Sequence, residues 1–219
     1  MTTAIIGVGN IGSTLARNLT RGGETVVLAA RDKSRAEKLA EQLGPLASAA
    51  SVERAMAAGD AVVFALWLDA IKEVIPQHAE LLQDKVVVDP SNPLTVDENG
   101  QFHRTLPEDQ SAASVVAALL PASAHYVKAF GTVGADSLAN GANREPAAVL
   151  FYATDDDVAA TTIEPLIRAT GFEPVKAGGF ADAGRIEGPA GDLTQPGLNR
   201  EFVDVDEARA AVAAKGVTV

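Results

Sequence analysis

The chain contains no cysteine among its 219 residues. This absence excludes disulfides, thiolate nucleophiles, zinc–thiolate sites and iron–sulfur clusters, and it fits a reducing compartment. The longest unbroken apolar stretch, residues 61–68, is far shorter than the roughly 20 residues of a membrane-spanning helix. No basic segment precedes the first apolar run at Ala4. We therefore predict a cytoplasmic protein with no secretory signal and no membrane partner.

Positive charge is also scarce. Lysine and arginine number 18 against 29 aspartate and glutamate residues, which gives a net charge of −11 and an isoelectric point near 4.7. Such a chain repels polyanions, so we expect no nucleic-acid partner. Apolar residues make up 47% and charged residues 21%, as in an ordinary globular protein. The length predicts one domain, with or without a small appendage.

Strand-like apolar runs alternate with helical patterns from the N-terminus. Ile11, Leu15 and Leu19 recur every four residues between apolar runs at 3–7 and 25–30. The alternation predicts an α/β fold, a doubly wound and mostly parallel sheet of the Rossmann NAD(P)-binding type. Further strands are expected at 46–49, 60–66, 85–89, 125–130, 146–153 and 172–176, and helices at 34–43, 51–58, 69–82, 111–120 and 156–170.

Two segments lack this periodicity. Residues 90–110 carry three prolines and a glycine among polar residues and predict a long, functional loop. Beyond Gly178 the chain is rich in glycine and proline until a short helix that starts at Asp204. We therefore predict a Rossmann-type NADP-binding domain over residues 1–177 and a C-terminal extension over 178–219.

A glycine-rich loop follows the first strand and opens the first helix. In this context Gly7 permits a tight turn, Gly9 lets a pyrophosphate approach the backbone, and Gly12 lets the helix pack close to the strand. The helix N-terminus then offers N–H groups to phosphate. The predicted cofactor-binding residues here are Gly7, Gly9, Asn10, Ile11 and Gly12.

The end of the second strand indicates which dinucleotide is bound. NAD sites usually have an acidic residue there, whereas this chain has Ala30 followed by Arg31. Residues 31–38 contain four basic and two acidic side chains. This basic island suits the 2′-phosphate of NADP, and we count Ser34 and Arg35 with Arg31 among its candidate ligands.

The sequence offers few groups for acid–base or nucleophilic catalysis. Its three histidines, His78, His103 and His125, are not spaced with an acid or a hydroxyl as in a catalytic triad. Tyr126 and Lys128 stand two residues apart on a predicted strand, unlike the helical Tyr/Lys pair of short-chain dehydrogenases.

Two further features stand at the ends of predicted strands. The three aspartates at 155–157 precede a predicted helix, so we interpret them as a cap and expect no metal site. Trp67 is the only tryptophan. Its side chain either packs in the core or forms a wall against which a flat ring binds. No catalytic side chain is identified, which fits hydride transfer between two bound rings that the protein holds stacked and dry.

Several motifs together resemble the family of F420-dependent NADP oxidoreductases and the related reductase domain of the STEAP metalloreductases. The likeness spans about residues 3–177. It rests on the glycine loop, Ala30-Arg31 with Arg35, Ala65-Leu66-Trp67, the segments 85–93 and 127–133, and the aspartates at 155–157.

The resemblance implies NADP as the cofactor, deazaflavin F420 or a flavin as the small-molecule redox acceptor, and a homodimer. It implies that Arg31 and Arg35 hold the 2′-phosphate. Leu66, Trp67, Asn92 and Pro93 would border the nicotinamide, and Thr132, Val133 and Ala135 would line the pocket for the second ring.

The sequence departs from the family pattern at three places. Ala30 stands where some relatives carry serine, and Gly131 replaces a frequent asparagine or histidine. The tail, including residues 188–192 and 195–197, does not resemble the apolar C-terminal helix that helps to build the acceptor pocket in the F420 enzymes. The NADP half of the site is thus better defined than the acceptor half.

Two alternatives remain at the level of sequence. A reductase of small imines or hydroxy acids shares the glycine loop but adds a large helical domain, for which the 42 residues after position 177 are too few unless a dimer completes the site. A non-catalytic NADP(H) sensor would also fit the small number of candidate catalytic groups.

Overall fold

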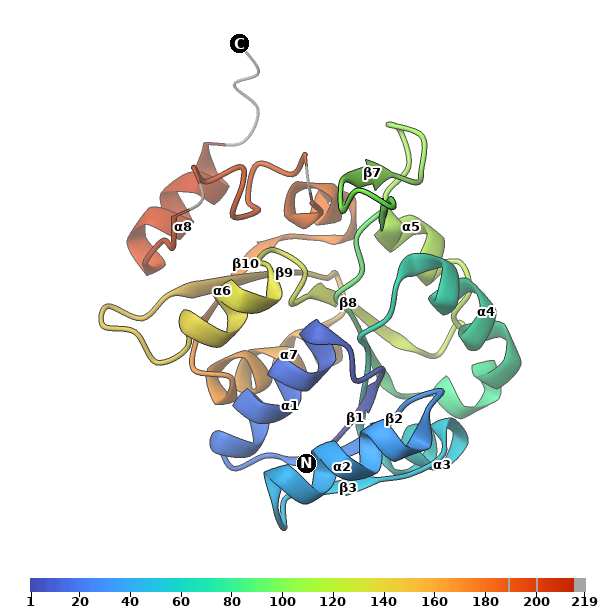
Figure 1. Cartoon of the computed structure of the whole chain (residues 1–219). Helices are drawn as coiled ribbons and strands as arrows, with labels where there is room; N and C mark the ends of the chain where they lie inside the picture. The colour runs from blue at the N-terminus through green and yellow to red at the C-terminus, as the bar shows by residue number, and fades with distance from the viewer. Residues whose placement is uncertain (189, 200, 215–219) are drawn as a thin grey trace.

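An eight-stranded sheet forms the centre of the protein, seen in a computed structural model that describes residues 1–188, 190–199 and 201–214 (Figure 1). A separate two-stranded ribbon projects from it. The strands are β1 (Thr2–Ile6), β2 (Thr25–Ala29), β3 (Ala47–Ala49), β4 (Ala61–Phe64), β5 (Val86–Asp89), β6 (Leu94–Val96), β7 (Phe102–Arg104), β8 (His125–Ala129), β9 (Val149–Ala153) and β10 (Glu173–Gly178).

Helices connect most of these strands. The α-helices are α1 (Asn10–Arg21), α2 (Lys33–Leu43), α3 (Val52–Ala58), α4 (Leu68–His78), α5 (Ala112–Ala117), α6 (Ala135–Asn140), α7 (Asp157–Ala169) and α8 (Val205–Ala213). Two 3₁₀-helices are η1 (Ala79–Leu82) and η2 (Phe180–Ile186).

The sheet has the strand order β10-β9-β8-β5-β4-β1-β2-β3. Neighbouring strands are parallel except β8 and β9, which pair antiparallel. The crossover from β3 to β4 reverses the direction in which strands are added, between β1 and β4. In sheets of this kind ligands bind at the carboxyl ends of the strands beside this point. The predicted doubly wound, mostly parallel fold is confirmed.

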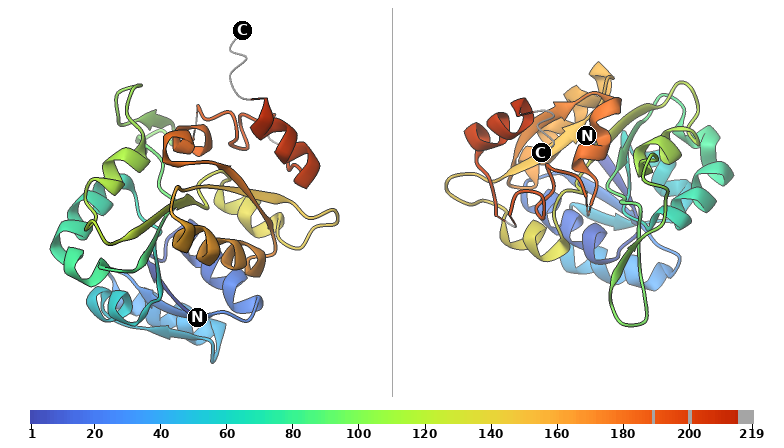
Figure 2. Two further views of the ribbon diagram at one scale, coloured as in Figure 1. Left: turned by 180° about the vertical axis from the view of Figure 1, so that it is seen from behind. Right: turned by 90° about the horizontal axis from the view of Figure 1, so that it is seen from above.

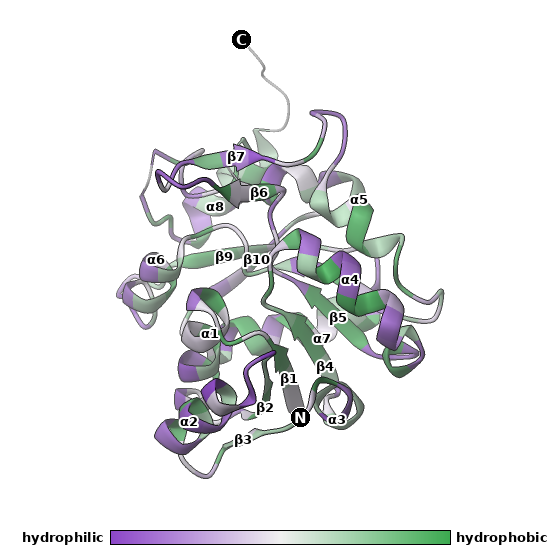
Figure 3. Cartoon of the chain, turned by 45° about the vertical axis from the view of Figure 1, so that its right-hand side comes forward, coloured by the Kyte–Doolittle hydropathy of each residue, from purple (hydrophilic) through white to green (hydrophobic). Residues whose placement is uncertain are grey.

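The central strands β4 and β5 are coloured as hydrophobic in Figure 3. Their apolar residues form the core on both faces of the sheet. Ile5 and Val63 point to the face covered by α1, α2, α6 and α7. Ile6 and Val62 point to the opposite face, which α3, α4 and α5 cover. This alternation along continuous apolar strands is what burial on both faces requires, and it holds the loops at the strand ends in place.

The structure differs from the sequence-based expectation at four places. The segment 90–110 is not wholly irregular, because it contains the hairpin β6–β7, which stands away from the body (Figure 2). One helix was predicted over residues 69–82, whereas α4 ends at His78 and the 3₁₀-helix η1 follows it. The six-residue α6 and the 3₁₀-helix η2 were not predicted.

The C-terminal segment packs against the sheet. Ile186 of η2, Leu193 and Ala208 of α8 are buried with Phe151 of β9 and Val175 of β10. The predicted helix start at Asp204 is confirmed, since Asp204 caps α8. Pro189 and residues 215–219 of the predicted extension lie outside the described residues. None of the described helices is long and apolar enough to span a bilayer.

Candidate functional site

Two glycines of the loop after β1 are required by the fold itself. Gly7 has a φ of +103°, donates its N–H to the Ala29 oxygen at 2.8 Å, and would place a Cβ 2.4 Å from the Ala65 oxygen. Gly12 would place a Cβ 2.0 Å from the Gly7 oxygen. The tight turn and the close packing of α1 on it therefore leave no room for a side chain at either position.

Gly9 is different, because nothing in the fold requires it to be a glycine. Its φ is −71°, which any residue adopts, and a Cβ there would meet no atom within 4 Å. Gly9 is also exposed. The missing side chain leaves open space directly before α1, as a ligand that contacts the backbone needs.

The helices that begin at the carboxyl ends of β1, β4 and β8 share a second feature. α1, α4 and α6 start at Gly9, Trp67 and Gly134, and none of these residues provides a side-chain cap. α1 also lacks an acidic residue in its first turn. The first N–H groups of α1 thus have no capping side chain, and such groups can bind an anion such as a diphosphate. In contrast, side chains cap α2, α3, α5, α7 and α8, from Asp32, Ser51, Ser111, Asp156 and Asp204.

The predicted 2′-phosphate ligands lie at the start of α2. Arg31 is exposed and forms no salt bridge with any described residue. Arg35 reaches back to the glycine loop and donates from Nη2 to the Val8 oxygen at 3.5 Å. Ser34 Oγ donates to Asp32 Oδ1 at 2.7 Å, and this bond above all lowers the pKa of Asp32 below its usual value.

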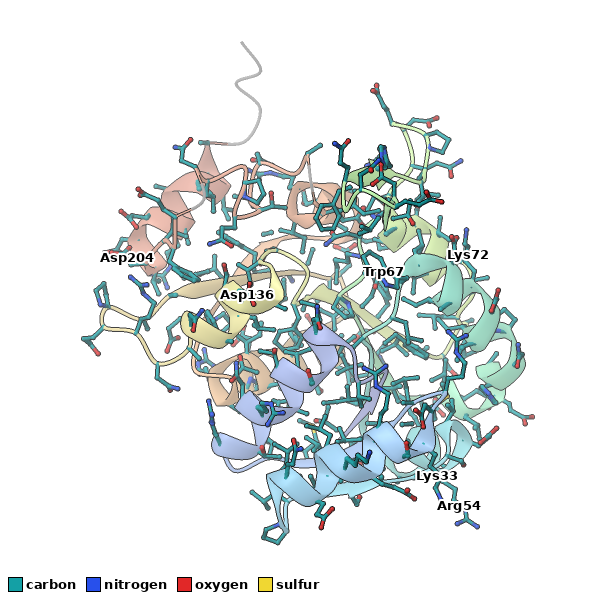
Figure 4. The ribbon with its side chains drawn as sticks, viewed as in Figure 1. Lys33, Arg54, Trp67, Lys72, Asp136 and Asp204 are labelled. Carbon is teal, nitrogen blue, oxygen red and sulfur yellow. The ribbon has the colours of Figure 1, made fainter. Side chains whose placement is uncertain are left out.

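Leu66 and Trp67 follow β4 at the same edge of the sheet. Leu66 packs over the turn, since a Cβ on Gly7 would lie 2.8 Å from Leu66 Cδ2. Trp67 is 58% exposed at the start of α4 (Figure 4). This exposure excludes core packing as the role of Trp67 and leaves its indole available to a flat ring.

Asn92 lies at the crossing of three segments. Its Nδ2 donates to the Gly131 oxygen after β8 at 2.9 Å, and its Oδ1 accepts from Gly188 N of the C-terminal segment at 2.7 Å. Pro93 is buried beside it. The side-chain amide of Asn92 therefore fixes the loop that is predicted to border the nicotinamide.

Sequence reasoning missed a buried polar network under this loop. Lys128 Nζ donates to Asp89 Oδ2 at 2.9 Å and to the Ser91 oxygen, and it lies 3.4 Å from Glu187 Oε1. Tyr126 OH donates to Asp89 Oδ2 at 2.8 Å. Burial and the nearby carboxylates raise the pKa of Tyr126 well above its usual value. Three charged groups thus lie inside the protein next to the candidate site.

Two of the residues predicted to contact the acceptor line a very small cavity. Thr132 and Val133 surround about 10 Å³ together with Leu193, Gln195 and Leu198 of the C-terminal segment, among others, which is room for about one water molecule. Gln195 N donates to the Thr132 oxygen at 2.8 Å. The Thr132 hydroxyl is buried and has no hydrogen-bond partner among the residues that the structure describes. Ala135 begins α6 and does not line this cavity.

The histidines lie away from these loops or pair elsewhere. His125 starts β8 at the other end of the strand and pairs with Asp156 at 2.7 Å. His103 pairs with Asp97 inside the hairpin at 2.8 Å. His78 lies 3.9 Å from Glu53. The described geometry therefore gives none of them a partner in a catalytic triad.

The fold and the open glycine loop define a Rossmann-type domain. Residues 2–93 match the family described as NADP oxidoreductase, coenzyme F420-dependent. The match covers less than half of the chain and agrees with the resemblance seen in the sequence. No curated protein matches the chain.

Solved structures show the same architecture over most of the chain. A hypothetical protein from Sinorhizobium meliloti is 29% identical, with a TM-score of 0.78 over 89% of this chain and 93% of that one. A protein from Arthrobacter sp. FB24, proposed to be an F420-dependent NADP reductase, is 22% identical, with a TM-score of 0.71 over 84% of this chain and 87% of that one.

A reductive aminase from Aspergillus terreus, solved with NADPH4, cyclohexanone and allyl amine, has the same fold at 20% identity and a TM-score of 0.61. The match covers 82% of this chain but only 55% of the aminase, so the chain spans about half the length of that enzyme. Family and fold together indicate an NADP-dependent oxidoreductase.

Proposed function

We propose that the protein transfers a hydride between NADP(H) and a flat redox acceptor, deazaflavin F420 or a flavin. The family match over residues 2–93 supports the NADP side. The description of the Arthrobacter protein, at 22% identity, is consistent with F420 as the acceptor. A homodimer and a cytoplasmic location remain predictions from the sequence.

The observation that carries the proposal is the open space at Gly9 before the uncapped helix α1. A glycine that neither packing nor backbone geometry requires points to a group outside the protein. A diphosphate satisfies both features, because it accepts from free N–H groups and needs close approach to the backbone. Arg31 and Arg35 then lie where a 2′-phosphate adds two negative charges.

The protein's own part in this chemistry is binding and orientation. When bound, the dihydronicotinamide supplies the hydride, two electrons with one proton, while the acceptor takes a further proton from solvent and NADP⁺ remains. The exposed Trp67 offers a flat wall, and the loop at Asn92 limits how the ring is placed. Close stacking of two rings is the main rate contribution that these residues can make.

Cofactor preference provides the first test. We expect calorimetry to show tighter binding of NADPH than NADH, and Arg31→Ala to weaken NADPH about tenfold or more while NADH changes little, since only NADPH carries the phosphate. Arg209→Ala, an exposed arginine on α8, serves as the matched control and should alter neither. Equal weakening of both nucleotides by Arg31→Ala would contradict the assignment of Arg31.

Turnover provides the second test. Purified protein is mixed with NADPH and F420, and then with NADPH and a flavin, and the absorbance of the acceptor is followed. Loss of the F420 band at 420 nm with equal loss of NADPH supports F420. NADPH binding with no oxidation by either acceptor would favour the non-catalytic sensor instead.

A further inference from the structure

Glu187 is an acid in the C-terminal segment whose side chain is buried. It is 4% exposed, although it follows η2 in a region rich in glycine and proline. A buried carboxylate needs hydrogen-bond donors or a cation. Glu187 has both, from elements about 60 to 75 residues earlier in the chain.

The first set of contacts joins Glu187 to the start of α5. Oε2 accepts from Ala112 N and Oε1 accepts from Ala113 N, each at 2.8 Å. These N–H groups are in the first turn of α5, where no helical partner exists for them. Residues 90–110, the segment that contains the hairpin β6–β7, lead into α5. Glu187 therefore fixes the end of this segment.

The second set of contacts joins Glu187 to the beginning of the same segment. Glu187 Oε1 lies 3.4 Å from Lys128 Nζ, and Lys128 donates to the Ser91 oxygen. The next residue, Gly188, donates its N–H to Asn92 Oδ1 at 2.7 Å. Glu187 and Gly188 thus fix the beginning of the segment 90–110 as well as its end.

We propose that Glu187 is a positioning residue for the nicotinamide half of the cofactor. It fixes the loop of Ser91, Asn92 and Pro93 from both sides without touching the cofactor. The inference rests on the proposed function, because it assumes that this loop borders the nicotinamide. Gly9 and Arg31, which are predicted to hold the diphosphate and the 2′-phosphate, are not among the described partners of Glu187.

The test separates the two halves of the cofactor. Calorimetry measures NADPH and the fragment 2′,5′-ADP, which lacks the nicotinamide, on the full chain and on Glu187→Gln and Glu187→Asp. Glu164→Gln is the control, because Glu164 on α7 is another hydrogen-bonded carboxylate, which accepts from the Tyr152 hydroxyl at 2.6 Å. Thermal unfolding is recorded for every variant.

We expect Glu187→Gln to weaken NADPH about tenfold while 2′,5′-ADP changes less than about twofold. The value of kcat with the active acceptor should fall by up to about 10²-fold, as a small misplacement of the reacting groups causes. Glu187→Asp keeps the charge, so its NADPH affinity should lie between those of the unmodified protein and Glu187→Gln. Glu164→Gln should change the affinity for neither ligand. Equal weakening of NADPH and 2′,5′-ADP, or no effect on either, would overturn the proposal.

Hydrogen exchange of the unmodified chain tests the same idea if Glu187→Gln does not fold. NADPH should slow exchange at the amides of Ser91, Ala112 and Ala113, whereas 2′,5′-ADP should not. Equal protection by both ligands would overturn the positioning role alone. If the unmodified chain binds neither ligand, the proposed function itself fails.

Discussion

Lys128 and Asp89 form an ion pair inside the protein, with 2.9 Å between Nζ and Oδ2 and side chains that are 1% and 0% exposed. Asp89 and Lys128 are register partners in β5 and β8. Glu187 places a second carboxylate beside the same amine. Lys128 is therefore the cation between two buried acids.

Replacement of this lysine should destabilise the protein strongly. Lys128→Met leaves both carboxylates buried without their cation, and we expect a loss of about 3–5 kcal/mol in the free energy of unfolding, measured with urea. Lys33→Met removes only the exposed pair with Glu37 and should change stability by less than about 1 kcal/mol. A Lys128→Met protein as stable as the Lys33→Met control would show that the buried pair adds nothing.

The glycine loop allows binding and folding to be separated. Gly9→Ala should cost at most about 1 kcal/mol in stability, yet weaken NADPH about tenfold or more, because its Cβ points into space that the protein does not use. Gly12→Ala should destabilise by about 1–3 kcal/mol or more through the clash with the Gly7 oxygen. Unchanged NADPH affinity in a folded Gly9→Ala protein would rule out close contact of a ligand at Gly9.

Replacing either of two buried threonines by valine should affect the free energy of unfolding differently. Thr132→Val removes a hydroxyl without a partner and should leave the protein as stable or slightly more so. Thr154→Val removes a hydroxyl that donates to the Tyr126 oxygen at 2.6 Å and accepts from Asp156 N at 3.0 Å, and it should cost about 1–3 kcal/mol. Urea titrations at one pH compare them, and a larger loss for Thr132→Val would indicate a partner that the structure does not show.

Asp156 should contribute to the pH dependence of stability. Burial acts to raise its pKa, but the N–H of Ala159 and the pairing with His125 together lower the pKa below its usual value. A lowered pKa in the folded state gives stability that is present above about pH 4 and is lost as the pH falls through the folded value. Asp156→Asn keeps a capping side chain but should be less stable than the unmodified protein at pH 7.

The difference in the free energy of unfolding between Asp156→Asn and the unmodified protein should shrink as the pH falls toward 2. Urea midpoints at several pH values provide the measurement, and thermal scans provide an independent check. A difference that stays constant from pH 7 to 2 would mean that the charge of Asp156 has no role and that only the hydrogen bonds of the cap matter.

The sequence predicted most of the sheet, because β1, β4 and β5 are continuous apolar strands with clear ends. It did not predict the hairpin β6–β7, whose strands have three residues each, too few for an alternating pattern to stand out. The roles of the cap residues Asp156 and Asp204 were predicted and are confirmed, since a cap depends only on residues close in the chain.

The network around Lys128 could not be predicted in the same way. Its contacts join residues such as Ala112 and Glu187 that are 75 positions apart, and no local pattern reports such a pairing. The only local signal was the spacing of Tyr126 and Lys128 on one face of β8, which places both beside Asp89. For the same reason the fit of the C-terminal segment against Thr132 became visible only in three dimensions.

The antiparallel direction of β9 affects which parts of the sequence form the candidate site. Because β9 and β10 run opposite to the rest of the sheet, η2 crosses back to deliver Glu187 and Gly188 to the loop at Asn92. The turn predicted to bind the nucleotide and the segment that packs against Thr132 and Val133, the predicted acceptor-side residues, thus lie far apart in the sequence. If the proposed function holds, substitutions at Leu193, Gln195 or Leu198 beside Thr132 would change the predicted acceptor side without altering Gly9 or Arg31.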